Sequence, residues 1–345
     1  MSLSLYVDGD RWRAHMRGVL ETYPGIVPVI KGNGYGFGNA RLARKATWLG
    51  VDTVAVGTYA EVEEVRSRFD GTILVLTPWR PFEQAVVYDD RVVHTVGRLE
   101  DLKELMARDD RPRVVLERMT SMRRHGFSAR GLRDAGDLLT DAVEVEGAAL
   151  HLPMAHGSHL SEVERLMTDI VAAGLPTQRV YVSHLTESEF ARLAATYPDY
   201  ELRPRVGTGL WLGDRGALAV RATVLDAHPV ERGDVFGYRG RSAPKSGTIL
   251  VVSGGTAHGI GLEAPPAAEG LRQRAVTLAK GGLDAAGFVR SPYTIGGKHR
   301  LFAEPPHMQA SMLFLPHGAP VPEIGEEVDV RVRFTTTRFD RTVVG

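Results

Sequence analysis

Cysteine is absent from this chain of 345 residues, and its positive and negative charges are equal in number. Without cysteine there is no disulfide framework, no thiolate-bound zinc or iron–sulfur cluster and no thiol nucleophile. With 42 Lys and Arg against 42 Asp and Glu, and no dense basic run, the broad positive field of a nucleic-acid-binding protein is missing. The sequence therefore predicts no nucleic-acid partner and no metal site.

Long hydrophobic runs are also missing. No stretch approaches the roughly 18 consecutive apolar residues of a membrane-spanning helix. Residues 1–8 lack the basic segment followed by an apolar one that is typical of a signal peptide. Hydrophobic residues make up 43% of the chain, which is enough for a sizeable core. We therefore expect a soluble, cytoplasmic protein of one large or two medium domains, with no membrane partner.

Short β-branched runs alternate with amphipathic helical stretches as far as about residue 206. The spacing predicts strands over 26–30, 53–57, 72–76, 92–96, 113–117, 145–151, 179–183 and 201–206. Helical periodicity marks 39–49, 59–68, 98–107, 159–173 and 187–196, and Thr186 and Glu189 have the spacing of a capping box. Eight strands, each followed by a crossover, favour a closed (β/α)8 TIM barrel, with a doubly wound open sheet as the alternative.

The pattern changes after about residue 220, where helical periodicity disappears. Short β-rich runs lie at 220–225, 248–252, 308–315 and 327–335, separated by segments rich in Pro and Gly. The span 264–300 shows weak periodicity and is expected to form long loops. The sequence thus predicts a barrel domain over 8–220 and an all-β domain over 221–345, with residues 1–7 packing against the second domain.

The predicted strand at 26–30 runs straight into Lys31 and a glycine-rich loop. The loop does not end in Gly-Lys-Ser/Thr, so it is not a Walker-type phosphate loop. It also fails the dinucleotide fingerprint G-x-G-x-x-G, because the third glycine would be Phe37 or Asn39. An exposed lysine in a glycine-rich turn is one interpretation. In a barrel, however, Lys31 lies at the carboxyl end of a strand, where active sites are built.

Residues 29–38 read Val-Ile-Lys-Gly-Asn-Gly-Tyr-Gly-Phe-Gly and resemble the pyridoxal 5'-phosphate (PLP) lysine motif of the alanine racemase family, usually V-K-A-N-A-Y-G-H-G. The resemblance implies a PLP-dependent isomerase with a barrel followed by a β domain. It implies that Lys31 forms the Schiff base with PLP and that the Tyr35 hydroxyl contacts the PLP phosphate. Lysine suits this chemistry, because a desolvated amine can form an imine and then act as a base.

A second stretch, Leu116–Phe127, is similar to the family segment K-V-D-T-G-M-G-R-L-G-F. It puts Arg124 where the family has an arginine near the PLP phenolic oxygen and the substrate carboxylate; a solvated basic turn is the alternative. Glu117 stands where the family often has a carbamylated lysine. The resemblance implies that its carboxylate holds the Arg124 guanidinium in a charge-assisted pair.

Two further matches complete the cofactor site that the resemblance implies. His151 falls where the family has a histidine near the PLP ring, although a buried structural histidine would fit the same pattern. Arg205 begins a segment that resembles R-P-G-I-A-L-Y-G, which puts Arg205 at the pyridine nitrogen and the N–H groups of Gly207 and Thr208 on the phosphate. Ser183 or His184 is a candidate for a further phosphate contact, and of the two Ser183 is preferred.

The C-terminal part resembles the family less closely. Thr256 stands in place of the catalytic tyrosine that acts opposite the lysine, and an aliphatic hydroxyl cannot replace a phenol as a base. His258 and Tyr293 are candidates for the second base, and an enzyme with no second base is the alternative. Met308 and Gln309 stand where the family has Met-Asp beside the substrate.

Three functions are open on this sequence. The first is a racemase or epimerase of a free or derivatised amino acid that uses Lys31 as one base. The second is another reaction on the same scaffold, although related decarboxylases, aldolases and dehydratases use cysteine. The third is a PLP-binding protein with little catalytic activity. The resemblance also implies a head-to-tail homodimer, with each site completed by the β domain of the partner. We expect weak activity on alanine itself because of Thr256.

Overall fold

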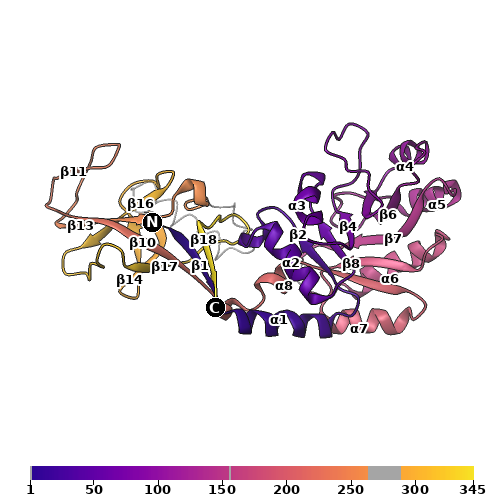
Figure 1. Ribbon diagram of the computed structural model, residues 1–345, viewed down its shortest axis with the longest axis horizontal. Helices are drawn as coiled ribbons and strands as arrows, with labels where there is room; N and C mark the ends of the chain where they lie inside the picture. Colours follow the sequence, from indigo (N-terminus) through magenta and orange to yellow (C-terminus); the bar gives the residue numbers. More distant parts are fainter. Residues whose placement is uncertain (1, 155–156, 263–288) are drawn as a thin grey trace. The chain divides into compact units, whose positions relative to one another are not determined.

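The computed structural model describes residues 2–154, 157–262 and 289–345, and the chain divides into two compact units (Figure 1). The barrel unit is Arg13–Gly213, and the β unit joins Met1–Trp12 to Asp214–Gly345. Within the described residues no helix is both long and apolar enough to cross a bilayer.

The barrel unit is a closed ring of parallel strands. β9 pairs with β2, with Val27 opposite Arg205, and this pairing closes the ring. The closure confirms the predicted (β/α)8 barrel and excludes the open doubly wound sheet. In order the strands are β2 (Val27–Ile30), β3 (Thr53–Val56), β4 (Thr72–Val75), β5 (Val92–Val96), β6 (Arg113–Arg118), β7 (Glu144–His151), β8 (Arg179–Ser183) and β9 (Glu201–Val206).

Helices surround the strands (Figure 1). They are α1 (Gly9–Thr22), which leads into the barrel, and α2 (Asn39–Leu49), α3 (Val62–Arg66), α4 (Leu99–Met106), α5 (Ala129–Leu138), α6 (Leu160–Ala172), α7 (Glu187–Thr196) and α8 (Thr208–Leu212). The predicted capping box of α7 is confirmed: Glu189 N donates to Thr186 Oγ1 at 3.3 Å, and Thr186 N donates to Glu189 Oε2 at 2.9 Å. The connection 76–91 has no helix, and Pro78 and Pro81 interrupt it.

The barrel interior is filled by inward-pointing side chains. They are Val27, Val29, Ala55, Leu74, Val93, Val115, Ala149 and Tyr181, all buried. A packed interior leaves no pore, so chemistry in this unit is confined to the loops at the strand ends.

The β unit is one large sheet with the order β13-β16-β15-β14-β17-β10-β1-β18, and β13 also pairs with β10. Its strands are β1 (Leu3–Val7), β10 (Leu218–Val230), β13 (Gly247–Ser253), β14 (Arg290–Ile295), β15 (Lys298–Phe302), β16 (Ala310–Pro316), β17 (Glu327–Val330) and β18 (Arg341–Val344). A small hairpin, β11 (Val235–Phe236) and β12 (Arg241–Ser242), extends from it. β1 lies between β10 and β18, so the first strand of the chain is an interior strand of this sheet.

The expectation of long loops over 264–300 is wrong where the structure describes it. β14 and β15 form a hairpin whose turn is Gly296–Gly297, with φ of +58° and +72°. Paired glycines favour this turn because both positions need positive φ. The remainder of the span, 264–288, lies outside the described residues.

Candidate active site

Lys31 is the first residue after β2, at the carboxyl end of the barrel. Its pKa is lowered, first by desolvation and then by the positive charges of Arg124 and Arg205, while Glu61 opposes the shift. Glu61 joins the loops after β2 and β3, because its carboxylate accepts from Gly32 N at 2.7 Å and Gly57 N at 2.6 Å. The lysine therefore stands at the barrel mouth in a cationic environment that favours the neutral amine.

Tyr35 is buried in the turn between β2 and α2, with the strained φ of +52°. A Cβ added to Gly207, directly after β9, would lie 2.1 Å from the Tyr35 hydroxyl and 3.3 Å from the Val29 Cβ. The missing side chain thus lets the phenol approach the backbone of the β9–α8 turn. Burial, with a smaller contribution from Glu61, raises the pKa of Tyr35 to about 12, so the hydroxyl stays protonated and can donate to an anion.

Arg205, Ser183 and His151 form a hydrogen-bonded chain. Arg205 Nε donates to Ser183 Oγ at 3.0 Å, Arg205 Nη2 donates to the Leu150 carbonyl at 3.0 Å, and Ser183 Oγ lies 3.2 Å from His151 Nδ1. Because Ser183 Oγ accepts from Arg205, its own proton is available to His151 Nδ1. Desolvation, followed by nearby cationic groups, lowers the pKa of His151 to about 3, so this imidazole is neutral.

Glu117, on β6, is buried, and its Oε2 has no hydrogen-bond partner in the described part of the chain. Desolvation raises the pKa of this carboxyl, and Arg205 and then Arg124 oppose the shift. The expected charge-assisted pair between Glu117 and Arg124 is not formed among the described residues, because Arg124 lies in an exposed turn after β6. An unpartnered buried carboxylate oxygen is rare, and a bound group that donates to it is one way to satisfy it.

His184 follows β8 directly, next to Ser183, and belongs to the same mouth. Its φ is +64°, and its ring lies 5.2 Å from that of His151 in an edge-on contact. Desolvation lowers its pKa, with Arg205 and Lys31 as the next causes. The signal in the sequence was its place directly after a strand end.

Thr256, Met308 and Gln309 come together in the β unit through backbone hydrogen bonds. Thr256 N donates to the His307 carbonyl at 2.8 Å, Ala257 N to the Met308 carbonyl at 3.0 Å, and Gly254 N to the Gln309 carbonyl at 3.0 Å. The Met308 side chain is 69% exposed, and Thr256 and Gln309 are exposed beside it. Two segments far apart in the sequence therefore form one surface.

His258 and Tyr293 are buried in the β unit rather than presented on that surface. His258 Nδ1 accepts from Gly255 N at 3.2 Å, and its Nε2 lies 3.1 Å from Asp340 Oδ1. The Tyr293 hydroxyl donates to the Ser253 and Gly254 carbonyls, each at 2.9 Å, and burial raises its pKa well above its usual value. Both side chains therefore make their hydrogen bonds within the β unit, and neither is presented on the surface formed by Thr256, Met308 and Gln309.

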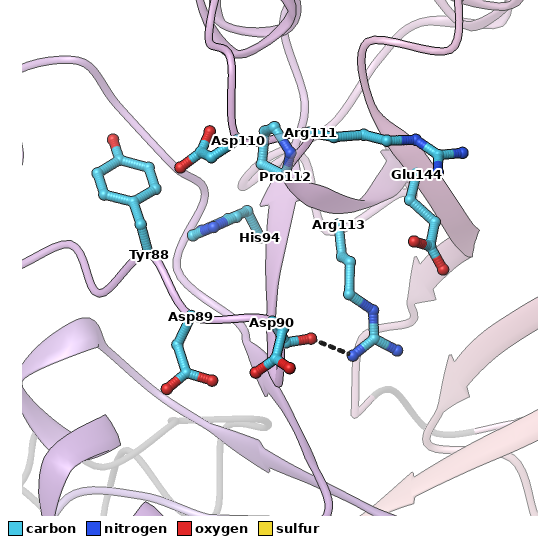
Figure 2. Close-up of a pocket in the computed structure, with 9 residues that line it drawn as sticks. All are labelled: Tyr88, Asp89, Asp90, His94, Asp110, Arg111, Pro112, Arg113 and Glu144. Atoms are coloured by element: carbon cyan, nitrogen blue, oxygen red, sulfur yellow. Dashed lines mark hydrogen bonds between the residues drawn. The ribbon is translucent and has the colours of Figure 1, made fainter.

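A separate pocket of about 390 Å³ lies at the other end of the barrel, where β5, β6 and β7 begin (Figure 2). Several of its charged groups are engaged with the protein: Arg113 donates to the Asp90 carbonyl at 2.8 Å, and Asp110 pairs with Arg108 at 2.6 Å. Its lining is Tyr88, Asp89, Asp90, His94, Asp110, Arg111, Pro112, Arg113 and Glu144, and no predicted site residue is among them. It is therefore not the candidate active site.

Solved structures share this fold. The alanine racemase from Bartonella henselae with covalently bound pyridoxal phosphate superimposes with a TM-score of 0.73 at 17% identity, over 96% of this chain and 91% of that one. The histidine racemase from Leuconostoc mesenteroides subsp. sake gives a TM-score of 0.70 at 17% identity, over 99% and 98% of the two chains.

Sequence comparison identifies the family. An alanine racemase from Mycolicibacterium vanbaalenii is 26% identical over 278 residues, which cover 72% of this chain and 70% of that protein. The family model for the alanine racemase N-terminal domain matches residues 7–214, which include the whole barrel. The resemblance seen in the sequence is thereby confirmed, and the chain belongs to the alanine racemase family.

Proposed function

We propose that this protein is a PLP-dependent amino-acid racemase that holds PLP on Lys31 and uses this lysine as one of its bases. Membership of the alanine racemase family makes isomerisation the reaction class and PLP the cofactor. The observation that carries the assignment of Lys31 is its place at the end of β2, with a lowered pKa, in the same mouth as Arg205, Arg124 and His151.

The residues of the barrel mouth fit PLP. The protonated Tyr35 hydroxyl and the Gly207 backbone, with no Cβ between them, suit a phosphate group. Arg205 uses Nε and Nη2 within the protein, and its Nη1 has no hydrogen-bond partner among the described residues, so Nη1 is available to a ring nitrogen. We assign the exposed Arg124 to the phenolic oxygen and the substrate carboxylate, and the Glu117 Oε2 atom, which has no partner among the described residues, as an acceptor for the Arg124 guanidinium.

PLP, when bound, withdraws electrons from an attached amino acid and so acidifies its Cα–H bond. The residues of this chain then move the proton. Because Lys31 has a lowered pKa, a larger share of its amine is neutral near pH 7 and can take a proton at Nζ. Arg205 keeps its proton even though desolvation lowers its pKa to about 10, so the pyridine nitrogen is an acceptor and is not itself protonated. A weak electron sink suits simple proton exchange.

The β unit supplies the other half of the proposed site through a head-to-tail homodimer. Thr256, Met308 and Gln309 form an exposed surface that includes a large apolar side chain, Met308. We assign this surface to the barrel mouth of a second copy, where it would contact the substrate. The amino acid itself is open, and alanine is expected to be a poor substrate because of Thr256.

The test has two parts, binding and turnover. The protein is loaded with PLP, reduced with borohydride and digested, and mass spectrometry then locates the pyridoxyl group, which we expect on Lys31. The loaded protein is next incubated with each proteinogenic L-amino acid, and chiral chromatography measures the D-enantiomer. PLP on Lys31 together with a D-product supports the proposal. Bound PLP without any D-product would favour the alternative, a PLP-binding protein with another reaction or little activity.

A further inference from the structure

A histidine–carboxylate pair lies in the turn before β16. His307 Nε2 is 2.6 Å from Glu304 Oε1, and the Glu304 side chain is only 2% exposed, whereas that of His307 is 29% exposed. The same Oε1 accepts from Tyr238 N at 3.2 Å, and the ring of Tyr238 lies 4.6 Å from the His307 ring. Tyr238, in the turn of the hairpin β11–β12, therefore positions the Glu304 carboxylate, and this carboxylate positions the His307 imidazole.

This pair fixes which nitrogen of His307 carries the proton. An ionised carboxylate only accepts hydrogen bonds, so Nε2 of His307 must be the donor to Glu304. Nδ1 of the neutral ring is then the acceptor, and it makes no hydrogen bond with the described residues. A buried carboxylate that fixes the orientation and tautomer of an imidazole is a frequent arrangement in general acid–base catalysis.

His307 also lies on the part of the proposed site that lacks a second base. Its carbonyl accepts from Thr256 N at 2.8 Å, and the next residue, Met308, belongs to the exposed surface assigned to the substrate. Thr256 cannot exchange a proton near neutral pH. His258 and Tyr293 are buried and bonded within the sheet. Among the described residues of this surface, His307 is thus a side chain whose Nδ1 is still available as an acceptor.

We propose that His307 is the second base of the racemase, acting from the β unit of one copy on the barrel site of the other, with Glu304 as its positioning residue. This inference rests on the proposed function. In one direction Lys31 Nζ takes the proton from Cα while the protonated Nδ1 of His307 gives one to the opposite face. In the other direction His307 Nδ1 takes the proton and Lys31 returns one. The Cα–H bond that breaks is replaced by the one that forms, and no oxidant or reductant is consumed.

The first experiment compares His307→Asn with the matched control His228→Asn, in D2O, on an amino acid that the wild type racemises. His228 is also a histidine of the β unit beside a carboxylate, at 3.2 Å from Asp226, but it is 58% exposed on β10. We expect His307→Asn to lower racemisation at least about 100-fold. In His307→Asn, deuterium should still enter Cα of the enantiomer whose proton Lys31 removes. It should no longer enter Cα of the other enantiomer, whose proton His307 would remove. His228→Asn should behave like the wild type.

The second experiment needs no turnover. The imidazole 15N signals of the PLP-loaded wild type should show His307 with its proton on Nε2, and Glu304→Gln should shift the population towards the other tautomer. Full racemisation by His307→Asn, equal loss of exchange in both enantiomers, or a wild-type proton on Nδ1 would overturn the assignment of His307. Lack of exchange by the wild type with every amino acid would instead overturn the proposed function, and with it this inference.

Discussion

At the scale of single residues, three of the four non-glycine residues with positive φ in the described part of the chain lie at the carboxyl end of the barrel, and the fourth, Arg111 with φ of +46°, lies before β6 at the other end. Tyr35, Arg123 and His184 have φ of +52°, +51° and +64°, and they lie in the connections after β2, β6 and β8. Such conformations cost on the order of 1–3 kcal/mol each for non-glycine residues, and they persist where the surrounding structure holds them. Their common location at the carboxyl ends of strands agrees with the site proposed there.

The contact between Gly207 and Tyr35 gives a direct prediction. We expect Gly207→Ala to weaken PLP binding at least about tenfold, because the new Cβ would lie 2.1 Å from the Tyr35 hydroxyl and displace it. Titration of the apoprotein with PLP, followed by fluorescence, measures the dissociation constant. Gly209→Ala is the control, since a Cβ there meets only the Val206 side chain at 3.4 Å. Equal affinity of the two variants for PLP would contradict this account of the turn.

Ser183 gives a second prediction at this scale. Ser183→Ala removes the acceptor of Arg205 Nε and a partner of His151 Nδ1, and leaves a buried charged donor unsatisfied. We expect the free energy of unfolding of the apoprotein to fall by about 1–3 kcal/mol, measured in urea. Ser242→Ala is the control, because Ser242 is exposed and its hydroxyl makes no hydrogen bond with the described residues. An unchanged midpoint for Ser183→Ala would show that Arg205 is held in another way.

At the scale of elements, local sequence signals predicted the strands of the barrel and the helices α2, α3, α4, α6 and α7, but not α1, α5 and α8. The capping box of α7 was visible because Thr186 and Glu189 have the required spacing. The hairpin β14–β15 was missed because its strands mix charged and apolar residues, although the paired glycines of its turn were visible. The connection 76–91 has no helix because its prolines interrupt it. Counting one crossover after each strand does not take these prolines into account.

Glu189 joins two elements and gives a pH-dependent prediction. Its Oε1 accepts from His159 N at 2.6 Å, just before α6, and its Oε2 accepts from Thr186 N at 2.9 Å, at the start of α7. Although burial raises its pKa, the hydrogen bonds from Thr186, His159 and Ser158 outweigh burial and lower the pKa to about 2. We expect Glu189→Gln to lower the free energy of unfolding at pH 7 by about 1–3 kcal/mol.

The sign of the pH effect follows from the lowered pKa. The stabilisation by the Glu189 carboxylate is complete above the unfolded pKa of about 4.3, and it is lost as the pH falls towards about 2. The difference between wild type and Glu189→Gln in urea unfolding should therefore be smaller at pH 3.5 than at pH 7. Glu187→Gln, an exposed glutamate in the same first turn, is the control and should show little change at either pH. A difference that grows in acid would contradict the assignment.

At the scale of the whole molecule, the sequence was most informative about the barrel mouth. The family resemblance implied one site for Lys31, Arg205 and His151, and in the structure each of them follows or lies near the end of a parallel strand, so that they meet at one face. The pair of Glu304 and His307 could not be found in this way. The pair lies beside Thr256 only because the backbones of two segments some fifty residues apart are hydrogen-bonded to each other. Periodicity and local motifs do not predict such long-range pairing.

The proposed homodimer makes a prediction about assembly. Sedimentation of the PLP-loaded protein should give twice the 37.7 kDa mass of the chain, and racemisation per chain should fall when dilution separates the copies. Met308→Glu should weaken association, because it would bury a charge in place of an exposed apolar side chain. A monomer with full activity per chain at every dilution would contradict a site shared between copies.

The central claim, that Lys31 at the barrel mouth exchanges the α-proton of a PLP-bound amino acid, is tested most directly by solvent deuterium. The PLP-loaded wild type and Lys31→Ala are incubated in D2O with each proteinogenic L-amino acid, and mass spectrometry after chiral separation measures deuterium at Cα. For at least one amino acid we expect a D-enantiomer with deuterium at Cα from the wild type and none from Lys31→Ala. Stoichiometric PLP on Lys31 with no deuterium at Cα of any amino acid would contradict it.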